Sequence, residues 1–314
     1  MRRISAAAAL TVGLGINSFA VADQSIYPQV AQTEHASPET ARLFEGFFAA
    51  KSEHDVSETM RFFSPAMLTY TDATLGWPMN SFTTLQALFQ NYMPKWPPAA
   101  LSYPTRILGG PQSALIDVID TRELFGSELH VLAAVDLKDG KIVRWVDYWD
   151  GNAFDAAAYQ QMRTAQEKFP TDFQERQVGE DSSNRMRSIA LKLQSALAKG
   201  DADAAAALFS SAAAVYEDRV LHCEVLGQAA IGRYLRRVLP RVPFGTGATL
   251  RHVVGGDRGG GFEWISPAAS KQFPGVTALE LDGEGKITRL TSVYDGRQLS
   301  PELLDELATL SIER

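Results

Sequence analysis

The chain contains an internal repeat, and this repeat limits its fold more than any other feature. Tyr70-Thr71-Asp72 in the first half corresponds to Tyr216-Glu217-Asp218 in the second half, at an offset of 146 residues. Asp150-Gly151 corresponds to Asp295-Gly296 at an offset of 145, so the register shifts by a single residue over the repeat. Self-similarity over this length indicates a duplicated structural unit. We therefore predict two similar domains, at residues 37–155 and 184–296.

Both halves have the same predicted order, in which helices precede most of the strands. Ser37 and Pro38 mark a helix start, because serine caps the first turn and proline suits the first helical position. Asp55 with Glu58 three residues later is typical of the start of a second, short helix. Strands are expected at 66–72, 101–108, 113–123, 128–137 and 141–149, and at 248–254, 260–266, 275–281 and 286–294. Helices on one face of a curved antiparallel sheet form an α+β fold, which encloses a cavity or fills it with side chains.

The first 22 residues have the composition of a secretory signal peptide. Arg2 and Arg3 precede an apolar run, and Ala20-Val21-Ala22 supplies small residues for cleavage. We predict export to the periplasm or the exterior, with an organelle transit peptide as the alternative. Residues 156–183 are expected to form a tail helix and a linker, and residues 297–314 a terminal helix or tail.

Charge and cysteine content exclude several classes of function. The net charge is −7 and the sequence lacks a basic cluster suited to a phosphate backbone, so we expect no nucleic acid partner. Cys223 is the one cysteine, and the five histidines are scattered without the spacing of metal ligands. We therefore expect no metal. We also expect no cofactor, because the sequence contains no phosphate-cradling glycine loop followed by a helix.

The strand at 141–149 carries the main candidate for chemistry. Trp145, Asp147 and Trp149 share one face of this strand, because side chains alternate along it. Burial between two indoles would raise the pKa of Asp147 and suit it to acid–base catalysis. The alternative is a solvent-facing Asp147 with tryptophans that pack between layers. Ser292 stands at this position in the second half, which indicates that the two halves differ in role.

Asp117 is the second carboxylate candidate, because it lies on an otherwise apolar face of the strand at 113–123. Glu263 occupies the same position in the second half. We predict that Asp117 and Asp147 form a base and an acid with separated pKa values. His130 is a further acid–base candidate, with a structural role as the alternative.

The sequence resembles the NTF2-like superfamily, and its polyketide-cyclase-type (SnoaL-like) branch in particular. The resemblance lies in the order of elements, in the Tyr-x-Asp of the first strand, and in the closing run Asp-Gly-Lys-Ile-Val-Arg-x-x-x-Tyr-Trp-Asp at 139–150. It implies two tandem cone-shaped domains, each with helices packed on a curved sheet around a small-molecule pocket. It also implies that Tyr70 is a hydrogen-bond donor in the pocket, unless this tyrosine only closes the core, and that domains pair through their sheets within one chain or in a homodimer.

The resemblance and the candidate residues together favour a cofactor-independent isomerase, dehydratase or cyclase. Its substrate would be a hydrophobic polyketide- or steroid-like small molecule, with Trp145, Trp149, Tyr216 and Glu263 as contacts. The rival hypothesis is an exported, non-catalytic binder or carrier of an apolar ligand. A third is an assembly module whose cones are filled.

Overall fold

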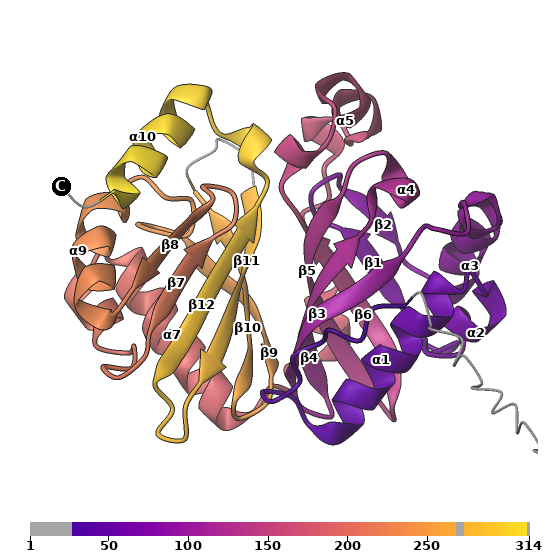
Figure 1. Cartoon of the computed structure of the whole chain (residues 1–314), viewed down its shortest axis with the longest axis horizontal. Helices are drawn as coiled ribbons and strands as arrows, with labels where there is room; N and C mark the ends of the chain where they lie inside the picture. The colour runs from indigo at the N-terminus through magenta and orange to yellow at the C-terminus, as the bar shows by residue number, and fades with distance from the viewer. Residues whose placement is uncertain (1–26, 268–272, 313–314) are drawn as a thin grey trace, which may run out of the picture.

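The structure is a computed structural model that describes residues 27–267 and 273–312. The predicted signal peptide at residues 1–22 lies outside the described residues and stays a prediction. Two domains lie side by side, each with one six-stranded sheet (Figure 1). Helices cover the outer faces, and the two sheets face each other at the centre of the molecule (Figure 1). None of the described helices is long and apolar enough to cross a membrane.

The amino-terminal domain begins with capped helices, as predicted. Ser37 accepts a hydrogen bond from the backbone N–H of Thr40, and Asp55 accepts one from Glu58 at 2.9 Å. The elements in chain order are α1 (Pro38–Ser52), α2 (Val56–Met60), β1 (Thr69–Asp72), β2 (Trp77–Met79), α3 (Phe82–Tyr92), η1 (Met93–Lys95), β3 (Ser102–Gly109), β4 (Ser113–Asp120), α4 (Arg122–Phe125), β5 (Leu129–Lys138) and β6 (Lys141–Tyr148).

A connecting segment and the carboxy-terminal domain follow. The connection contains η2 (Gly151–Ala153), α5 (Ala156–Met162), η3 (Gln166–Lys168) and α6 (Glu175–Val178). The second domain contains α7 (Asn184–Ala198), α8 (Ala202–Ala206), β7 (Val215–Asp218), β8 (Cys223–Leu226), α9 (Gln228–Val238), β9 (Thr249–Gly255), β10 (Gly259–Ser266), β11 (Phe273–Leu281), β12 (Ile287–Tyr294), η4 (Gly296–Gln298) and α10 (Pro301–Ser311).

The strand order confirms the two tandem α+β domains. It is β2-β1-β6-β5-β4-β3 in the first sheet and β8-β7-β12-β11-β10-β9 in the second, which is the same order twice. The sheets are mixed rather than purely antiparallel, because β1 pairs in parallel with β6 and β7 with β12. The strand predicted at 113–123 ends at Asp120, since residues 122–125 turn into α4 and Gly126 ends that helix at φ +82°. The short strands β2 and β8 were not predicted.

Apolar side chains and charged groups together form the layer between the two sheets. Leu115, Leu132 and Tyr148 belong to an apolar cluster that also contains Val276 and Val293 of the other domain. The contacts across this layer are reciprocal. Arg106 and His252 are repeat partners, and each contacts an acid of the other domain. The two acids, Glu280 on β11 and Asp136 on β5, also occupy equivalent positions in the two sheets.

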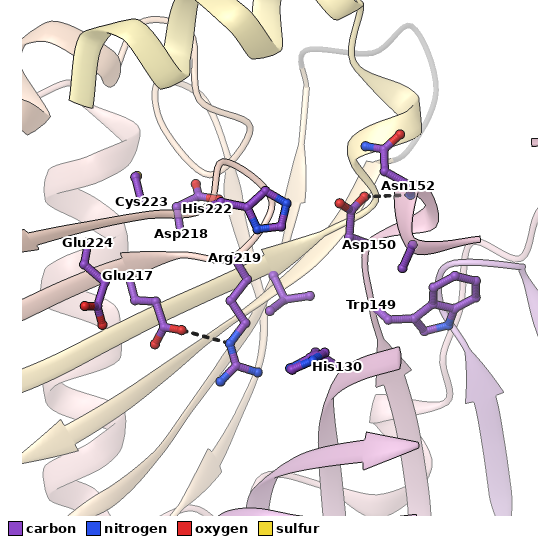
Figure 2. Close-up of a pocket in the computed structure, with 12 residues that line it drawn as sticks. His130, Trp149, Asp150, Asn152, Glu217, Asp218, Arg219, His222, Cys223 and Glu224 are labelled. Carbon is purple, nitrogen blue, oxygen red and sulfur yellow. Dashed lines mark hydrogen bonds and ion pairs between the residues drawn. The ribbon is translucent and has the colours of Figure 1, made fainter. Parts of the chain in front are cut away.

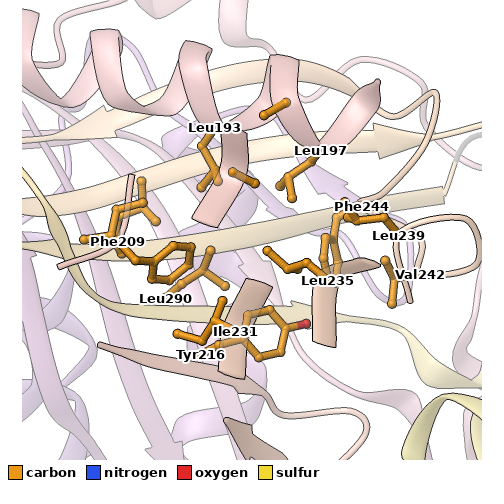
Figure 3. Packing of buried hydrophobic residues seen from close by; sticks show 14 of the residues in the cluster. Leu193, Leu197, Phe209, Tyr216, Ile231, Leu235, Leu239, Val242, Phe244 and Leu290 are labelled. Atoms are coloured by element: carbon orange, nitrogen blue, oxygen red, sulfur yellow. The ribbon is translucent and has the colours of Figure 1, made fainter. Parts of the chain in front are cut away.

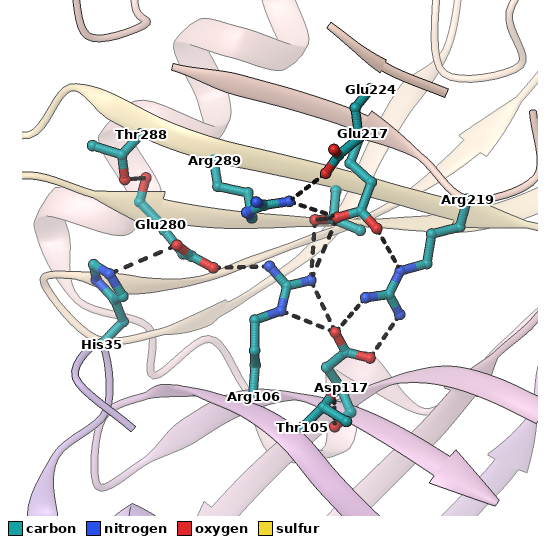
Figure 4. A network of polar contacts seen from close by, with 11 residues as sticks. His35, Thr105, Arg106, Asp117, Glu217, Arg219, Glu224, Glu280, Thr288 and Arg289 are labelled. Carbon is teal, nitrogen blue, oxygen red and sulfur yellow. Dashed lines mark hydrogen bonds and ion pairs between the residues drawn. The ribbon is translucent and has the colours of Figure 1, made fainter. Parts of the chain in front are cut away.

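These two contacts join Arg106 to Glu280 at 2.8 Å and His252 to Asp136 at 2.9 Å (Figure 4 shows the first). Gly110 and Gly256, also repeat partners, approach each other so closely that a Cβ on Gly110 would lie 3.3 Å from the Gly256 Cα. Contacts exchanged in this way are typical of a two-fold interface between identical subunits. The predicted pairing of the domains within one chain is therefore present.

Arg144 is the most deeply buried cation of this layer. Its guanidinium donates to Glu263 at 2.8 Å and to Asp136 at 3.2 Å, and Tyr148 also donates to Glu263, at 2.6 Å. Neither Arg144 nor Glu263 is exposed to solvent. Two buried charges of opposite sign compensate each other, but either one alone carries the full cost of burial.

We predict that Glu263→Gln destabilises the protein by about 3 to 5 kcal/mol, because it leaves the Arg144 charge only partly compensated. Denaturant unfolding at neutral pH would measure this. The matched control is Glu58→Gln, which breaks the solvent-exposed pair with Arg61 and should cost at most about 1 kcal/mol. Equal losses in the two variants would contradict a stabilising role for the layer between the sheets.

Candidate functional site

The cone of the amino-terminal domain contains a cavity of about 160 Å³ that opens to solvent. Tyr92 and Phe125 are partly exposed where they line this cavity, although large apolar side chains are mostly buried elsewhere. Eight aromatic side chains form much of the wall: Tyr70, Trp77, Phe89, Tyr92, Trp96, Phe125, Trp149 and Phe154. Three carboxylates, Asp72, Asp120 and Asp147, and one ammonium, Lys51, face the same space.

Asp147 lies on the cavity side of β6, as the alternation of the strand predicted. Tyr70 donates a hydrogen bond to one of its carboxylate oxygens, and the indole of Trp145 donates to the other at 2.5 Å. Tyr70 also stacks on Trp145 with almost parallel rings, 6.0 Å between centroids. Burial raises the pKa of Asp147 to about 6, although the two hydrogen bonds act in the opposite direction. Asp147 is thus held in one orientation and titrates close to neutral pH.

Asp72 also has a raised pKa, but for a reason that both domains share. It accepts hydrogen bonds from the backbone N–H groups of Thr74 and Leu75 and from the Trp149 indole. Its repeat partner Asp218 accepts the equivalent bonds from two backbone N–H groups and from Tyr294. Burial raises the pKa of each aspartate to about 7. Because the fully buried Asp218 of the second domain has the same set of donors, this arrangement holds a turn in place and is no evidence of catalysis.

Asp120 and Lys51 complete the polar part of the cavity. The Ser102 hydroxyl donates to Asp120, and the Lys51 ammonium lies 3.5 Å from the same oxygen. The second domain has Ser266 in place of Asp120, at the offset of 146. It likewise has Leu197 in place of Lys51 and Ser292 in place of Asp147. The charged groups that distinguish the two cones are therefore Asp120, Asp147 and Lys51.

The cone of the carboxy-terminal domain is filled with side chains. In the first domain Val118 pairs with Val131, but the equivalent pair in the second is Trp264 and Gly275. The Trp264 indole lies over Gly275, where a Cβ would clash with the ring. The same core contains Tyr216, Phe244 and Tyr294, all buried; Figure 3 shows Tyr216 and Phe244 among aliphatic side chains. The predicted contact of Tyr216 with a ligand is therefore corrected: Tyr216 is a core residue.

Asp117 and Glu263 lie between the sheets, and the expected Asp117–Asp147 pair is not formed. Asp117 is opposite Leu132 on β5, and Leu132 is opposite Tyr148, the neighbour of Asp147, so the two aspartates point to opposite sheet faces. Asp117 accepts hydrogen bonds from Arg106 at 2.9 Å and Arg219 at 2.6 Å (Figure 4).

Burial alone would raise the pKa of Asp117, but the two guanidinium groups lower it below its usual value. Glu263 is bound in the same layer by Arg144 and is fully buried, so it is not a ligand contact. The isolated acid Asp117 on an apolar strand face is thus an ion-pair partner. The partner comes from the other domain, which the sequence pattern did not reveal.

His130 lies outside the cone, at the entrance to a larger cavity between the domains, of about 440 Å³ (Figure 2). Its imidazole is exposed and lies 2.9 Å from Glu128. The cavity is also lined by His222 and Cys223, which are the repeat partners of Gly76 and Trp77.

On the other side of the molecule the equivalent space is occupied by the connecting segment. There Thr164 hydrogen-bonds to Leu75 and Gly76, and the Phe169 ring covers Gly76. The larger cavity is thus the unfilled counterpart of the groove that holds the connection. Its acids Asp150 and Glu217 already have partners. Asp150 accepts hydrogen bonds from backbone N–H groups and so caps a turn, and Glu217 contacts Arg219 and Arg289.

Of the predicted residues, Tyr70, Asp147 and Trp149 are thus brought together at the cone, with Trp145 directly behind Tyr70. Asp120 and Lys51 were missed as site residues. A comparison of the two halves contains the missing signal, because both positions lose their charge in the second half whereas Asp117 is matched by another acid.

Comparison with known proteins adds no family assignment, since no family model and no curated protein matches the chain. A structural search finds a steroid delta-isomerase from Pseudomonas aeruginosa among the matching solved structures. It is 13% identical, the match covers 42% of this chain and 93% of the other, and the TM-score is 0.33. An NTF-2 like protein of unknown function from Burkholderia xenovorans LB400 has 19% identity, 39% and 91% coverage, and a TM-score of 0.31. A SnoaL-like protein of unknown function from Burkholderia thailandensis has 11% identity, 35% and 94% coverage, and a TM-score of 0.31. We therefore derive the function from the site itself.

The pKa of Asp218 predicts how the stability depends on pH. The pKa of Asp218 is raised in the folded state, so ionisation of this side chain opposes folding. The stability that the protonated Asp218 contributes is present below about pH 4 and is lost as the pH rises to about 7. An asparagine side chain at this position cannot ionise and keeps the acceptor for the two N–H groups. Relative to the wild type, Asp218→Asn should therefore gain stability from pH 4 to pH 8, by a few kcal/mol in order of magnitude. Denaturant unfolding at several pH values tests this, and parallel curves for the two proteins would contradict the assignment.

Proposed function

We propose that the amino-terminal cone binds a small, largely apolar molecule and that Asp147 transfers a proton to or from it, in an isomerase or dehydratase type of reaction. The observation that carries this proposal is the pair of cones. The cone of the carboxy-terminal domain is closed by Trp264 and carries two serines. The cone of the amino-terminal domain is open and carries Asp120 and Asp147 at the same two positions. Opening a cavity and placing two acids in it costs stability, which favours a function for this space.

The environment of Asp147 supports a role as general base or acid. A group that transfers protons works best when its pKa lies near the working pH, and the pKa of Asp147 is raised to about 6. Tyr70 and Trp145 hold both carboxylate oxygens, so the side chain needs no reorientation before it reacts. Asp120 lines the same cavity beside Lys51 and is the second candidate for proton exchange with the ligand.

The size of the cavity narrows the range of substrates. About 160 Å³ is close to the roughly 150 Å³ of an apolar cavity that binds benzene. The enclosed part of the ligand is therefore about one ring in size, and a steroid-like skeleton would extend past Tyr92 and Phe125 into solvent. The rival proposal, a non-catalytic binder, uses the same aromatic wall and assigns no chemistry to Asp147.

Asp147→Asn should separate these two functions. In deuterated buffer, proton transfer can be followed by NMR as deuterium uptake into single-ring ketones and β,γ-unsaturated ketones. We expect the substitution to slow the enzyme-dependent exchange by about 100- to 10,000-fold, because it removes the titratable group and keeps the shape. The matched control is Ser292→Ala at the repeat position, which should leave the exchange rate unchanged. An exchange rate that Asp147→Asn does not alter would contradict catalysis.

Filling the open cone should remove binding without touching a charged group. The double variant Val118→Trp/Val131→Gly copies the pair that closes the other cone. Ligand binding would be measured by tryptophan fluorescence. We expect the double variant to lose binding, whereas Trp149→Ala should weaken binding and leave the cavity open. Far-UV circular dichroism would verify the fold. Unchanged affinity in a folded double variant would show that the ligand binds elsewhere.

A further inference from the structure

We propose that the ligand of the amino-terminal cone is a small organic cation, such as a trimethylammonium or a protonated amine on a short carbon skeleton. This inference rests on the proposed function in one respect only, namely that the cone is the ligand site. It adds the charge of the ligand, which the fold does not determine.

The first observation is an excess of negative charge. Asp72, Asp120 and Asp147 line the cavity, and among the described residues Lys51 is the one lysine or arginine that lines it with them. Lys51 lies 3.5 Å from Asp120 and so compensates that carboxylate first. The carboxylate of Asp147 accepts hydrogen bonds from the neutral Tyr70 and Trp145, which orient it without cancelling its charge. Asp72 adds acceptor oxygens, but burial raises its pKa to about 7, so it carries only part of a negative charge at neutral pH. A ligand with a positive charge would supply the missing compensation.

The second observation is that three hydrogen-bond donors of the wall, which could otherwise serve an anion, already have acceptors within the protein. The Tyr70 hydroxyl donates to Asp147 and the Trp149 indole donates to Asp72. The Trp77 indole donates to the carbonyl of Met162 at 2.8 Å. These three donors are therefore not free to bind a carboxylate or a phosphate, whereas carboxylate oxygens remain in the wall as acceptors.

The third observation is the aromatic wall. Ring faces attract cations electrostatically, and cages of aromatic rings are a recurrent solution for binding quaternary ammonium groups. Trp149 and Phe154 lie 5.4 Å apart between ring centroids, and Trp96 and Phe125 lie 6.3 Å apart, so the rings line the cavity in pairs. A ligand group with a spread positive charge and an apolar surface satisfies both the rings and the carboxylates.

The carboxy-terminal domain shows that the fold itself does not require Asp120, Asp147 or Lys51. Ser266 and Ser292 replace the two acids there and Leu197 replaces the lysine, whereas Asp72 keeps its counterpart Asp218; Trp264 fills the space. The excess of carboxylates thus occurs in the cone that is open to a ligand. This correlation between charge and open space is what a cation site predicts.

The test compares two probes of nearly equal shape, choline and 3,3-dimethylbutan-1-ol, in which a tert-butyl group replaces the trimethylammonium group. Binding to the full chain would be measured by calorimetry and by tryptophan fluorescence. We expect choline to bind about 10-fold more tightly than the neutral alcohol, because the carboxylates and the ring faces both attract the cation. In Asp120→Ser/Asp147→Ser, which keeps the rings and carries the serines of the closed cone, this ratio should fall clearly below that of the wild type.

The matched control is Glu123→Ser/Glu128→Ser, which removes two exposed charges from the same domain and leaves the cavity wall intact. It should keep the full preference for choline, which excludes a general effect of net charge. Equal affinity of the wild type for the two probes, or binding of neither, would overturn the inference. Neither result touches the proposed proton transfer, which the effect of Asp147→Asn on deuterium exchange tests independently of ligand charge.

Discussion

The layer between the two sheets is the constraint on which the rest of the molecule depends. Each sheet has helices on one face only, so the other face needs a cover, and the second domain provides it. Charged residues in this layer fix how the sheets meet. Arg144 contacts Asp136 of its own domain, but it reaches Glu263 only when β10 of the other domain lies against it. A purely apolar layer would allow the sheets to slide, whereas these pairs define one arrangement.

The duplication explains how one domain could acquire a function while the other gave it up. Both domains retain the structural carboxylate, Asp72 or Asp218, with the same two backbone donors and an aromatic donor. They differ where the cone opens: Val131 lines the cavity in one domain, and Gly275 admits the Trp264 ring in the other. The closed domain still buries the partner sheet and still contributes Arg219 and Glu263 to the shared layer. Its role is consistent with that of a scaffold for the open one.

The sequence predicted the fold well and the site in part, for physical reasons that differ. Helix caps at Ser37 and Asp55 and the repeat register depend on neighbours in sequence or on simple correspondence, so they could be recognised directly. The cavity face of β6 followed from alternation, which placed Asp147 correctly. Asp117 could not be interpreted in the same way, since its partners Arg106 and Arg219 come from another strand and another domain. The parallel pairing of β1 with β6 was missed as well, because it joins segments that lie far apart in the chain.

The filled cone has a consequence for the stoichiometry of binding. A duplicated chain with two open cones would hold two ligands and could couple them through the shared layer, as a dimer of identical subunits does. With Trp264 in place, a chain whose ligand site is the cone binds one molecule there, and its saturation curve has the simple hyperbolic form of a single site. Under the proposed function, the molecule keeps the architecture of a symmetric dimer but would bind its ligand as a monomer does.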